Sequence, residues 1–159
     1  MKPVRMRPVL AAILLLAVTA RASLDDGVTL FGPMVHYNFG GSDRSGWSFA
    51  IEVSRWKGLV GIDGGVEIDL RRQVRIYGEV EAGVVVAGAA AGPVLQFGNG
   101  GFRGGMQVSL WANYFAGADF RIRKFAGAPV EMAPGAYLKL MAVGTAGGDA
   151  GEHHGIFDD

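Results

Sequence analysis

Residues 60–70 read VGIDGGVEIDL, and apolar and polar residues alternate along this segment at nearly every second position. An amphipathic helix repeats its apolar positions about every 3.6 residues, whereas a β-strand sends successive side chains to opposite faces. The alternation therefore predicts a strand with one apolar face and one face that carries Asp63, Glu67 and Asp69.

The same alternation recurs in five further segments and, more weakly, in two others. The short connections between them are rich in Gly, Asn, Asp, Ser and Pro, which are the residues that turns require. Residues 83–92, rich in Val and Ala, are also compatible with a helix, but their glycines and three consecutive valines favour strand plus turn. The chain thus predicts an all-β antiparallel meander of about eight strands. The further segments are 31–39, 47–54, 73–84, 102–110 and 130–140, with 92–97 and 118–125 as the weaker two.

The first residues have the layout of a secretory signal peptide. Lys2, Arg5 and Arg7 precede an apolar run at 9–18, and small residues flank Arg21, so we expect cleavage after position 22. The apolar run is short for a spanning helix, and no later charge-free apolar run reaches roughly 18 residues. We therefore expect a signal peptide at 1–22, a β-barrel domain at 23–143 and a Gly-rich flexible tail at 144–159.

Composition limits the partners of the exported chain. The sequence has 15 basic and 15 acidic residues, and removing the four basic residues of the leader leaves 11 against 15, a net charge of −4. This balance argues against nucleic acid as a partner. The absence of cysteine excludes disulfides and the acylated cysteine of a lipoprotein.

A meander of eight strands leaves two open edges unless it closes into a barrel. The apolar face points inward in a soluble barrel and outward in a membrane barrel, where the polar face lines the lumen. The clear strands are close to the roughly 9–11 residues that a tilted strand needs to cross a bilayer. We therefore predict a closed antiparallel up-and-down β-barrel of about eight strands, of the transmembrane type. The alternative is a soluble periplasmic or secreted lipocalin-like barrel that binds a small apolar ligand inside.

Aromatic residues on the apolar face lie where strands are expected to end. Phe39 and Trp47 flank the turn at 40–46, while Tyr114 and Phe120 flank a turn near Gly117. Because aromatic rings are stable at the boundary between hydrocarbon and headgroups, these four residues predict an interfacial girdle.

The polar face carries both signs of charge in mid-strand. Inside a narrow lumen such groups must pair, because burying an unpaired charge is costly. We expect the acidic row Asp63, Glu67 and Asp69 to pair with Arg75 or Arg103 rather than to hold a cation. The predicted lumen charge network consists of Glu52, Asp63, Glu67, Arg75, Glu79, Glu81, Arg103, Arg121 and Lys139.

With its leader, alternating strands, aromatic borders and lack of cysteine, the chain resembles the small outer-membrane β-barrels of Gram-negative bacteria. The resemblance is one of architecture, covers nearly all of the exported chain, and points to no named family. It implies outer-membrane lipid and the barrel-assembly machinery as partners. Such barrels usually finish on a strand with a terminal aromatic residue, whereas this chain runs on to residue 159. Either Phe157 serves in a displaced position, or the last strand ends near Val143.

Candidate catalytic and metal-binding residues are few. Some outer-membrane barrels are lipid-modifying hydrolases with a serine, histidine and carboxylate triad, and here His36 shares a face with Ser48, Ser54 and Glu52. These side chains would point into the lumen, away from lipid, so we expect no catalytic residues and keep the hydrolase as an alternative. The adjacent histidines at 153–154 lack the spacing of a metal site, so we expect neither metal nor cofactor.

Function follows from the size of the barrel. Eight strands enclose a lumen that side chains can fill, so free diffusion of solutes is not expected. Short connections leave little loop for receptor binding. We therefore expect a non-enzymatic outer-membrane barrel with a structural role in the envelope or a narrow pore, of an oligomeric state that the sequence leaves open.

Overall fold

The computed structural model describes residues 27–41, 45–84, 86–98, 101–113 and 115–142. The predicted signal peptide, the predicted tail and Tyr114 lie outside these residues. No helix in the described part of the chain is long and apolar enough to cross a membrane.

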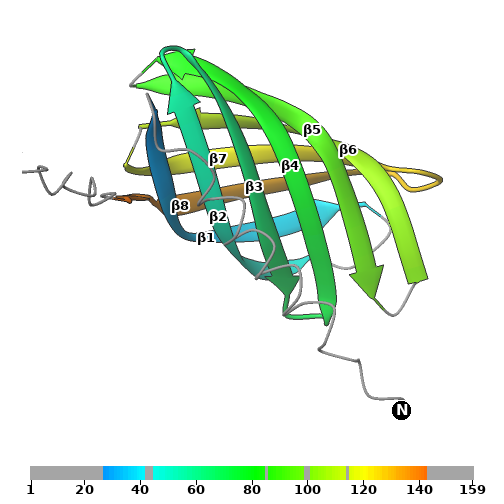
Figure 1. Cartoon of the computed structure of the whole chain (residues 1–159). Helices are drawn as coiled ribbons and strands as arrows, with labels where there is room; N and C mark the ends of the chain where they lie inside the picture. Colours follow the sequence, from blue (N-terminus) through cyan, green and yellow to red (C-terminus); the bar gives the residue numbers. More distant parts are fainter. Residues whose placement is uncertain (1–26, 42–44, 85, 99–100, 114, 143–159) are drawn as a thin grey trace, which may run out of the picture.

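Eight antiparallel strands form a closed barrel, which Figure 1 views from the side of β3, β4 and β5. Each strand pairs with the next along the chain, and β1 pairs with both β2 and β8, which closes the sheet. The predicted closed barrel of about eight strands is confirmed. The strands are β1 (Val28–Gly40), β2 (Gly46–Lys57), β3 (Val60–Asp69), β4 (Gln73–Val84), β5 (Ala87–Gly98), β6 (Gly101–Ala112), β7 (Ala116–Phe125), β8 (Val130–Leu138) and the two-residue β9 (Leu140–Met141).

The first and last strands meet at one end of the barrel, which we call the terminus end. There Leu30 of β1 lies beside Met141 of β9. The connections β2–β3, β4–β5 and β6–β7 also lie at this end, and the remaining four lie at the opposite end. Connections are short at both ends, since the longest spans residues 41–45. The barrel therefore presents little loop surface at either end.

The seam between β1 and β8 is the least regular part of the ladder. Its pairing breaks after Tyr137 opposite Met34 and resumes at Leu140 opposite Phe31. Pro33 lies in this gap and has no N–H to donate to the ladder. The proline therefore accounts for the division of the last strand into β8 and β9.

The predicted turn near Gly117 is wrong, because Gly117 lies inside β7 and the connection before it occupies residues 113–115. A Cβ at Gly117 would lie 1.8 Å from the carbonyl oxygen of Ala112. The glycine thus permits close approach of two strands rather than chain reversal. Phe120 is consequently a mid-strand residue and does not border a turn.

The barrel carries its apolar side chains on the outside and its charged side chains in the lumen, which is the reverse of the distribution in a soluble protein. Outward side chains such as Ile51 are apolar and exposed, at 66% for this residue, whereas Arg75 and Glu67 inside are 0% exposed. The lipocalin-like alternative requires the apolar face to point inward and is therefore wrong. The largest fully buried side chains are Arg75, Arg121, Arg123, Leu30, His36, Gln107 and Glu67.

Closure of the barrel should be sensitive to a methyl group at Gly32 in β1. A Cβ there would lie 1.7 Å from the carbonyl oxygen of Leu138, a backbone atom that cannot rotate away. We expect Gly32→Ala to destabilise the folded barrel by about 1–3 kcal/mol or more, the usual effect of overpacking. Semi-native electrophoresis of boiled and unboiled samples measures the folded fraction.

Gly104→Ala in β6 is the matched control. The nearest atom to its Cβ would be Cδ2 of Leu95 at 3.9 Å, an ordinary contact. Equal folded fractions for the two variants would contradict the close approach of β1 and β8.

Candidate functional site

A cluster of four charged side chains crosses the lumen in the half away from the terminus end. Glu67 of β3 and Arg75 of β4 face each other across the ladder and pair at 2.6 Å. Arg123 of β7 also binds Glu67, and each arginine contacts Glu131 of β8, at 3.2 Å from Arg75 and 3.1 Å from Arg123. We call these four residues the first network. It connects the two sides of the barrel through side chains alone.

A second network lies in the half nearer the terminus end and consists of Glu52, Asp119, Arg121 and Lys139. Arg121 donates to Glu52 at 2.7 Å and to Asp119 at 2.8 Å. Lys139 Nζ lies 2.7 Å from the other oxygen of Glu52. The guanidinium of Arg121 also lies 4.4 Å from the ring centre of Tyr77, a cation–π contact. Together the two networks join β2, β3, β4, β7 and β8 by buried charge pairs.

His36 links the two networks. Its Nε2 lies 3.1 Å from Asp119 of the second network, and its Nδ1 lies 3.9 Å from Glu67 of the first. The side chain is fully buried over Gly135 of β8, where a Cβ would lie 2.3 Å from the imidazole. This residue therefore fills the space between two layers of ion pairs.

The candidate hydrolase residues share the lumen but do not form a triad. His36 contacts carboxylates, and the Ser48 hydroxyl accepts a hydrogen bond from Asn38 at 2.8 Å instead. Glu52 is engaged by Arg121 and Lys139. A hydroxyl nucleophile needs a base within about 2.6–3.2 Å, and among these described side chains no hydrogen bond joins a serine to His36.

The part of the lumen beside the second network is rich in carboxylates. Asp63 lies opposite Glu79 in the β3–β4 ladder, and Glu79 accepts hydrogen bonds from Gln107 at 2.8 Å and from Ser109 at 2.9 Å. A gap of about 10 Å³ lies beside Asp63, Glu79, Glu81 and Ser109, which is room for about one water molecule. In the described part of the chain, no three His, Cys, Asp or Glu side chains are arranged to hold a metal ion.

Two tryptophans lie across the interior at the terminus end. Trp56 of β2 and Trp111 of β6 stack edge to face, with ring centres 5.6 Å apart. Glycines on the neighbouring strands make room for them, since a Cβ at Gly61 would lie 2.8 Å from the Trp56 ring and one at Gly88 would lie 2.2 Å from the Trp111 ring. The indoles occupy the lumen where a solute would have to enter or leave.

The structure places every residue of the predicted charge network on the inward face. Arg103 lies near the start of β6 with Gln96 as its ladder partner, so it belongs to the rim at the opposite end. Seven of the residues are buried, and two are half-buried. The buried ones are Glu52, Glu67, Arg75, Glu79, Glu81, Arg121 and Lys139, and the half-buried ones are Asp63 and Arg103.

The predicted network omitted several residues that complete it. Asp119 and Arg123 flank Arg121 at every second position of β7, so period-two alternation across 119–123 was the signal that identifies them. Trp56 lies beyond the predicted strand at 47–54, because β2 continues to Lys57. The pairing of Trp56 with Trp111 has no signal in the sequence, because the two residues lie on strands that are not neighbours.

Part of the predicted aromatic girdle lies at the opposite end of the barrel. Trp47 is the second residue of β2, is half exposed, and packs edge to face on Tyr37 with ring centres 5.2 Å apart. Phe39 is half-buried at the end of β1. Phe120 instead lies in mid-strand, as described above, and Tyr114 is outside the described residues. This part of the rim therefore combines Phe39 and Trp47 with Tyr37, which was not predicted.

Removing the guanidinium of Arg123 should destabilise the barrel strongly. Arg123→Met leaves Glu67 and Glu131 sharing one arginine, and breaking a buried ion pair typically costs about 3–5 kcal/mol. Urea unfolding in detergent micelles, followed by tryptophan fluorescence, measures the loss. Adding Glu67→Gln to this variant should restore part of the lost stability, because the uncompensated carboxylate charge is removed.

Lys124→Met is the matched control, because it replaces a cationic side chain by methionine at the next position of β7. Lys124 is the next residue of β7, points outward, and donates to the carbonyl of Ala128 at 2.6 Å. Its loss should cost no more than about 1.5 kcal/mol, the range of a single hydrogen bond. Equal losses from both variants would show that the interior pairs do not stabilise the barrel.

Comparisons with known proteins identify the fold and no family. No family model and no curated protein matches the chain. A designed transmembrane β-barrel is similar, with a TM-score of 0.53, 10% identity, and coverage of 73% of this chain and 98% of that one. Two structures of the attachment invasion locus protein Ail of Yersinia pestis, one with a heparin analogue, match with TM-scores of 0.36 and 0.37 at 13% and 14% identity. They cover 72% of this chain and 97% of Ail. The chain has the closed eight-stranded fold of transmembrane β-barrels.

Proposed function

We propose that this protein is an outer-membrane β-barrel with a closed interior, and that it serves a structural role in the cell envelope. The inverted distribution of side chains carries the proposal. An exposed apolar wall around a charged core is unfavourable in water, and lipid removes that penalty. The predicted leader and the transmembrane fold favour the outer membrane as the site of insertion, with lipid and the assembly machinery as partners.

The filled lumen favours a structural role over a pore. The first network, the second network and the indole pair each join strands across the lumen, at three levels of the barrel. Moving an ion along this path would require breaking buried charge pairs, and each charge left buried without its partner costs several kcal/mol. Because the connections are short, the barrel also lacks long loops that would bind a receptor within the described residues.

The same interior argues against catalysis. The best nucleophile candidates, Ser48 and Ser54, point into the lumen, where a lipid substrate has no access. The one histidine in the described residues is held by Asp119. We therefore propose a protein without enzymatic activity.

Depth in the bilayer should decide the effect of a charge on the outer wall. Ile51 lies in the middle of β2, and Leu59 lies in the β2–β3 connection at the terminus end, yet the two are equally exposed, at 66% and 65%. Ile51→Lys should cost roughly 2–4 kcal/mol and reduce recovery in the outer-membrane fraction, whereas Leu59→Lys should cost about 0–1 kcal/mol.

Cell fractionation and unfolding from lipid vesicles measure these effects. Recovery of the wild type as a soluble species without detergent would contradict the proposed membrane location. So would equal effects of the two lysine substitutions, because only a bilayer distinguishes their depths.

The folded protein should not conduct ions. We expect planar bilayers that contain the wild-type barrel to show no conductance steps, because side chains block the lumen. The triple variant Arg121→Ala/Arg123→Ala/Trp111→Ala removes a crossing side chain from each network and from the indole pair, and where it folds by heat-modifiability it should conduct. Steady conductance of the wild type would instead support the narrow pore.

A further inference from the structure

The half of the lumen nearer the terminus end contains more acidic than basic side chains, and we call it the acidic half. Of the described residues that line the small gap in this half, five are carboxylates and two are cations. The excess of negative charge is therefore three, or two if His36, which contacts Asp119, is charged. The carboxylates are Glu52, Asp63, Glu79, Glu81 and Asp119, and the cations are Arg121 and Lys139.

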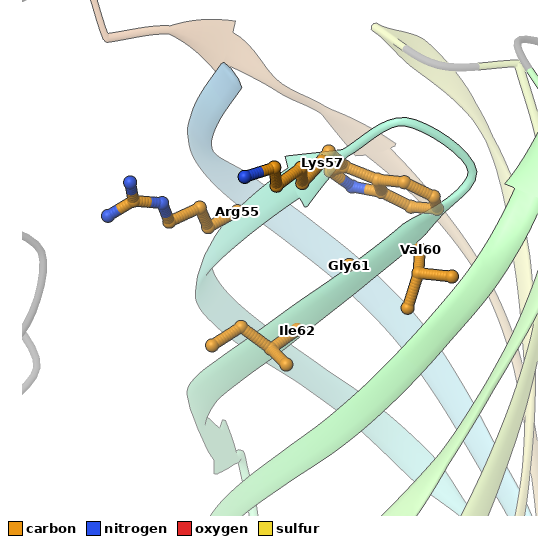
Figure 2. Close-up of a pocket in the computed structure, with 6 residues that line it drawn as sticks. Arg55, Lys57, Val60, Gly61 and Ile62 are labelled. Carbon is orange, nitrogen blue, oxygen red and sulfur yellow. The ribbon is translucent and has the colours of Figure 1, made fainter. Parts of the chain in front are cut away.

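This excess is not a general property of the interior. The first network is balanced, since it pairs two arginines with two glutamates. Cations elsewhere on β2 do not correct the imbalance, because Arg55 and Lys57 line a groove on the outer face of the barrel (Figure 2). Burying a charge without a partner is strongly unfavourable. The acidic half therefore requires a further source of positive charge.

Two of the five carboxylates lack the partners that the others have. Glu52 and Asp119 are bound by the cations of the second network, and Glu79 accepts hydrogen bonds from two neutral side chains of β6. Among the described residues, no donor reaches Oδ1 of Asp63 or Oε1 of Glu81. Glu81 is only 1% exposed, so bulk water does not take the place of a donor. The missing charge is thus needed at these two residues.

Asp63 of β3 and Glu81 of β4 are diagonal neighbours on the inward side of one ladder. Asp63 lies opposite Glu79, whereas Glu81 lies opposite Gly61 and has no side chain directly across from it. The carboxyl groups of Asp63 and Glu81 lie within hydrogen-bonding reach of each other. Two carboxylates offer acceptors only and repel each other, but a protonated carboxyl group donates to a carboxylate. A single proton would therefore satisfy both residues at once.

The surrounding groups provide no alternative donor of charge. Both cations of the acidic half are already bound to Glu52. A water molecule in the gap could donate hydrogen bonds but would leave the charge unchanged. The titratable and charged groups that face the pair are Glu52 of β2, Tyr77 and Glu79 of β4, Asp119 and Arg121 of β7, Tyr137 of β8, and Lys139 before β9.

We infer that Asp63 and Glu81 together form a proton-binding site inside the barrel, and that the folded protein retains this proton at neutral pH. A metal ion fits the position less well, because the described residues provide no group of three side chains arranged to hold one. The gap of about 10 Å³ also leaves no room for a hydrated ion. The inference goes beyond the proposed structural role, since it concerns the chemistry of the interior.

The bound proton should make the stability of the barrel fall as the pH rises. In the unfolded chain carboxyl groups have their ordinary pKa of about 4, so the pair releases its proton there at neutral pH. The folded state then binds one proton more than the unfolded state. Each unit of pH should therefore raise the unfolding equilibrium constant about tenfold through this site. Urea unfolding in detergent micelles from about pH 6 to 8 measures the slope.

Asp63→Asn/Glu81→Gln removes the site and keeps groups that can hydrogen-bond to each other. Relative to the wild type, this variant should become more stable by about tenfold in the unfolding equilibrium constant for each unit that the pH rises. Glu131→Gln is the matched control, because it removes a buried carboxylate that two arginines bind. It should lower stability at every pH and leave the slope unchanged. Equal slopes for the wild type and the double variant would overturn the inference.

Infrared spectroscopy detects the proton independently of stability. The folded full-length protein at neutral pH should show the carbonyl absorption of a protonated carboxyl group, and Glu131→Gln should retain it. Absence of this band from the wild type, or its persistence in the double variant, would overturn the inference. Stability that depends on the concentration of Na⁺ or Mg²⁺ rather than on pH would also overturn it, because a bound cation would then supply the charge. None of these outcomes bears on the fractionation test of the proposed function.

Discussion

Three arginines without access to solvent hold the interior of this barrel together. Arg75, Arg121 and Arg123 cannot lose their charge, so each must have a carboxylate within reach in the folded state. Glu67 serves Arg75 and Arg123, while Glu52 and Asp119 serve Arg121. The pairs Arg123–Glu67 and Arg121–Glu52 join strands that are not neighbours, so they form only when the sheet has closed. Closure of the barrel therefore completes the neutralisation of these arginines.

This coupling explains why the interior is both polar and filled. A small closed barrel has no volume for a hydrated charge, so the side chains themselves take the place of water. Arginine suits that role, since its planar group donates in several directions at once. Arg75, for example, reaches Glu67, Gln96 and Glu131 from one position. The result is a wall braced from inside, which is what the proposed structural role in the envelope requires.

The outer surface is apolar for the opposite reason. A charged side chain that faces hydrocarbon is unfavourable, so the outward charges are confined to strand ends, where headgroups and water begin. Lys124 marks one end and the pair Arg55 and Lys57 the other. At the terminus end the pair adjoins an apolar groove on the outer face.

Period-two alternation in the sequence determined the strands, their number and which residues share a face. It did so because the pleat sends neighbouring side chains to opposite sides whatever the rest of the chain does. It therefore placed Glu67, Arg75 and Arg121 together on one face. The same pattern did not decide which face is inside, since a soluble and a membrane barrel alternate alike.

Only the tertiary structure decided how the inward residues meet. Trp56 and Trp111, or Arg123 and Glu67, lie on strands that closure brings to face each other, and local sequence carries no record of that distance. Gly117 was misassigned for a related reason, because a glycine in a strand and a glycine in a turn are alike in sequence. Gly117 is required in its strand because the backbone of Ala112 lies close to it, and this contact exists only when β6 and β7 pair. Alternation, a local property, was readable from the chain, whereas the contacts across the lumen depend on the closed barrel.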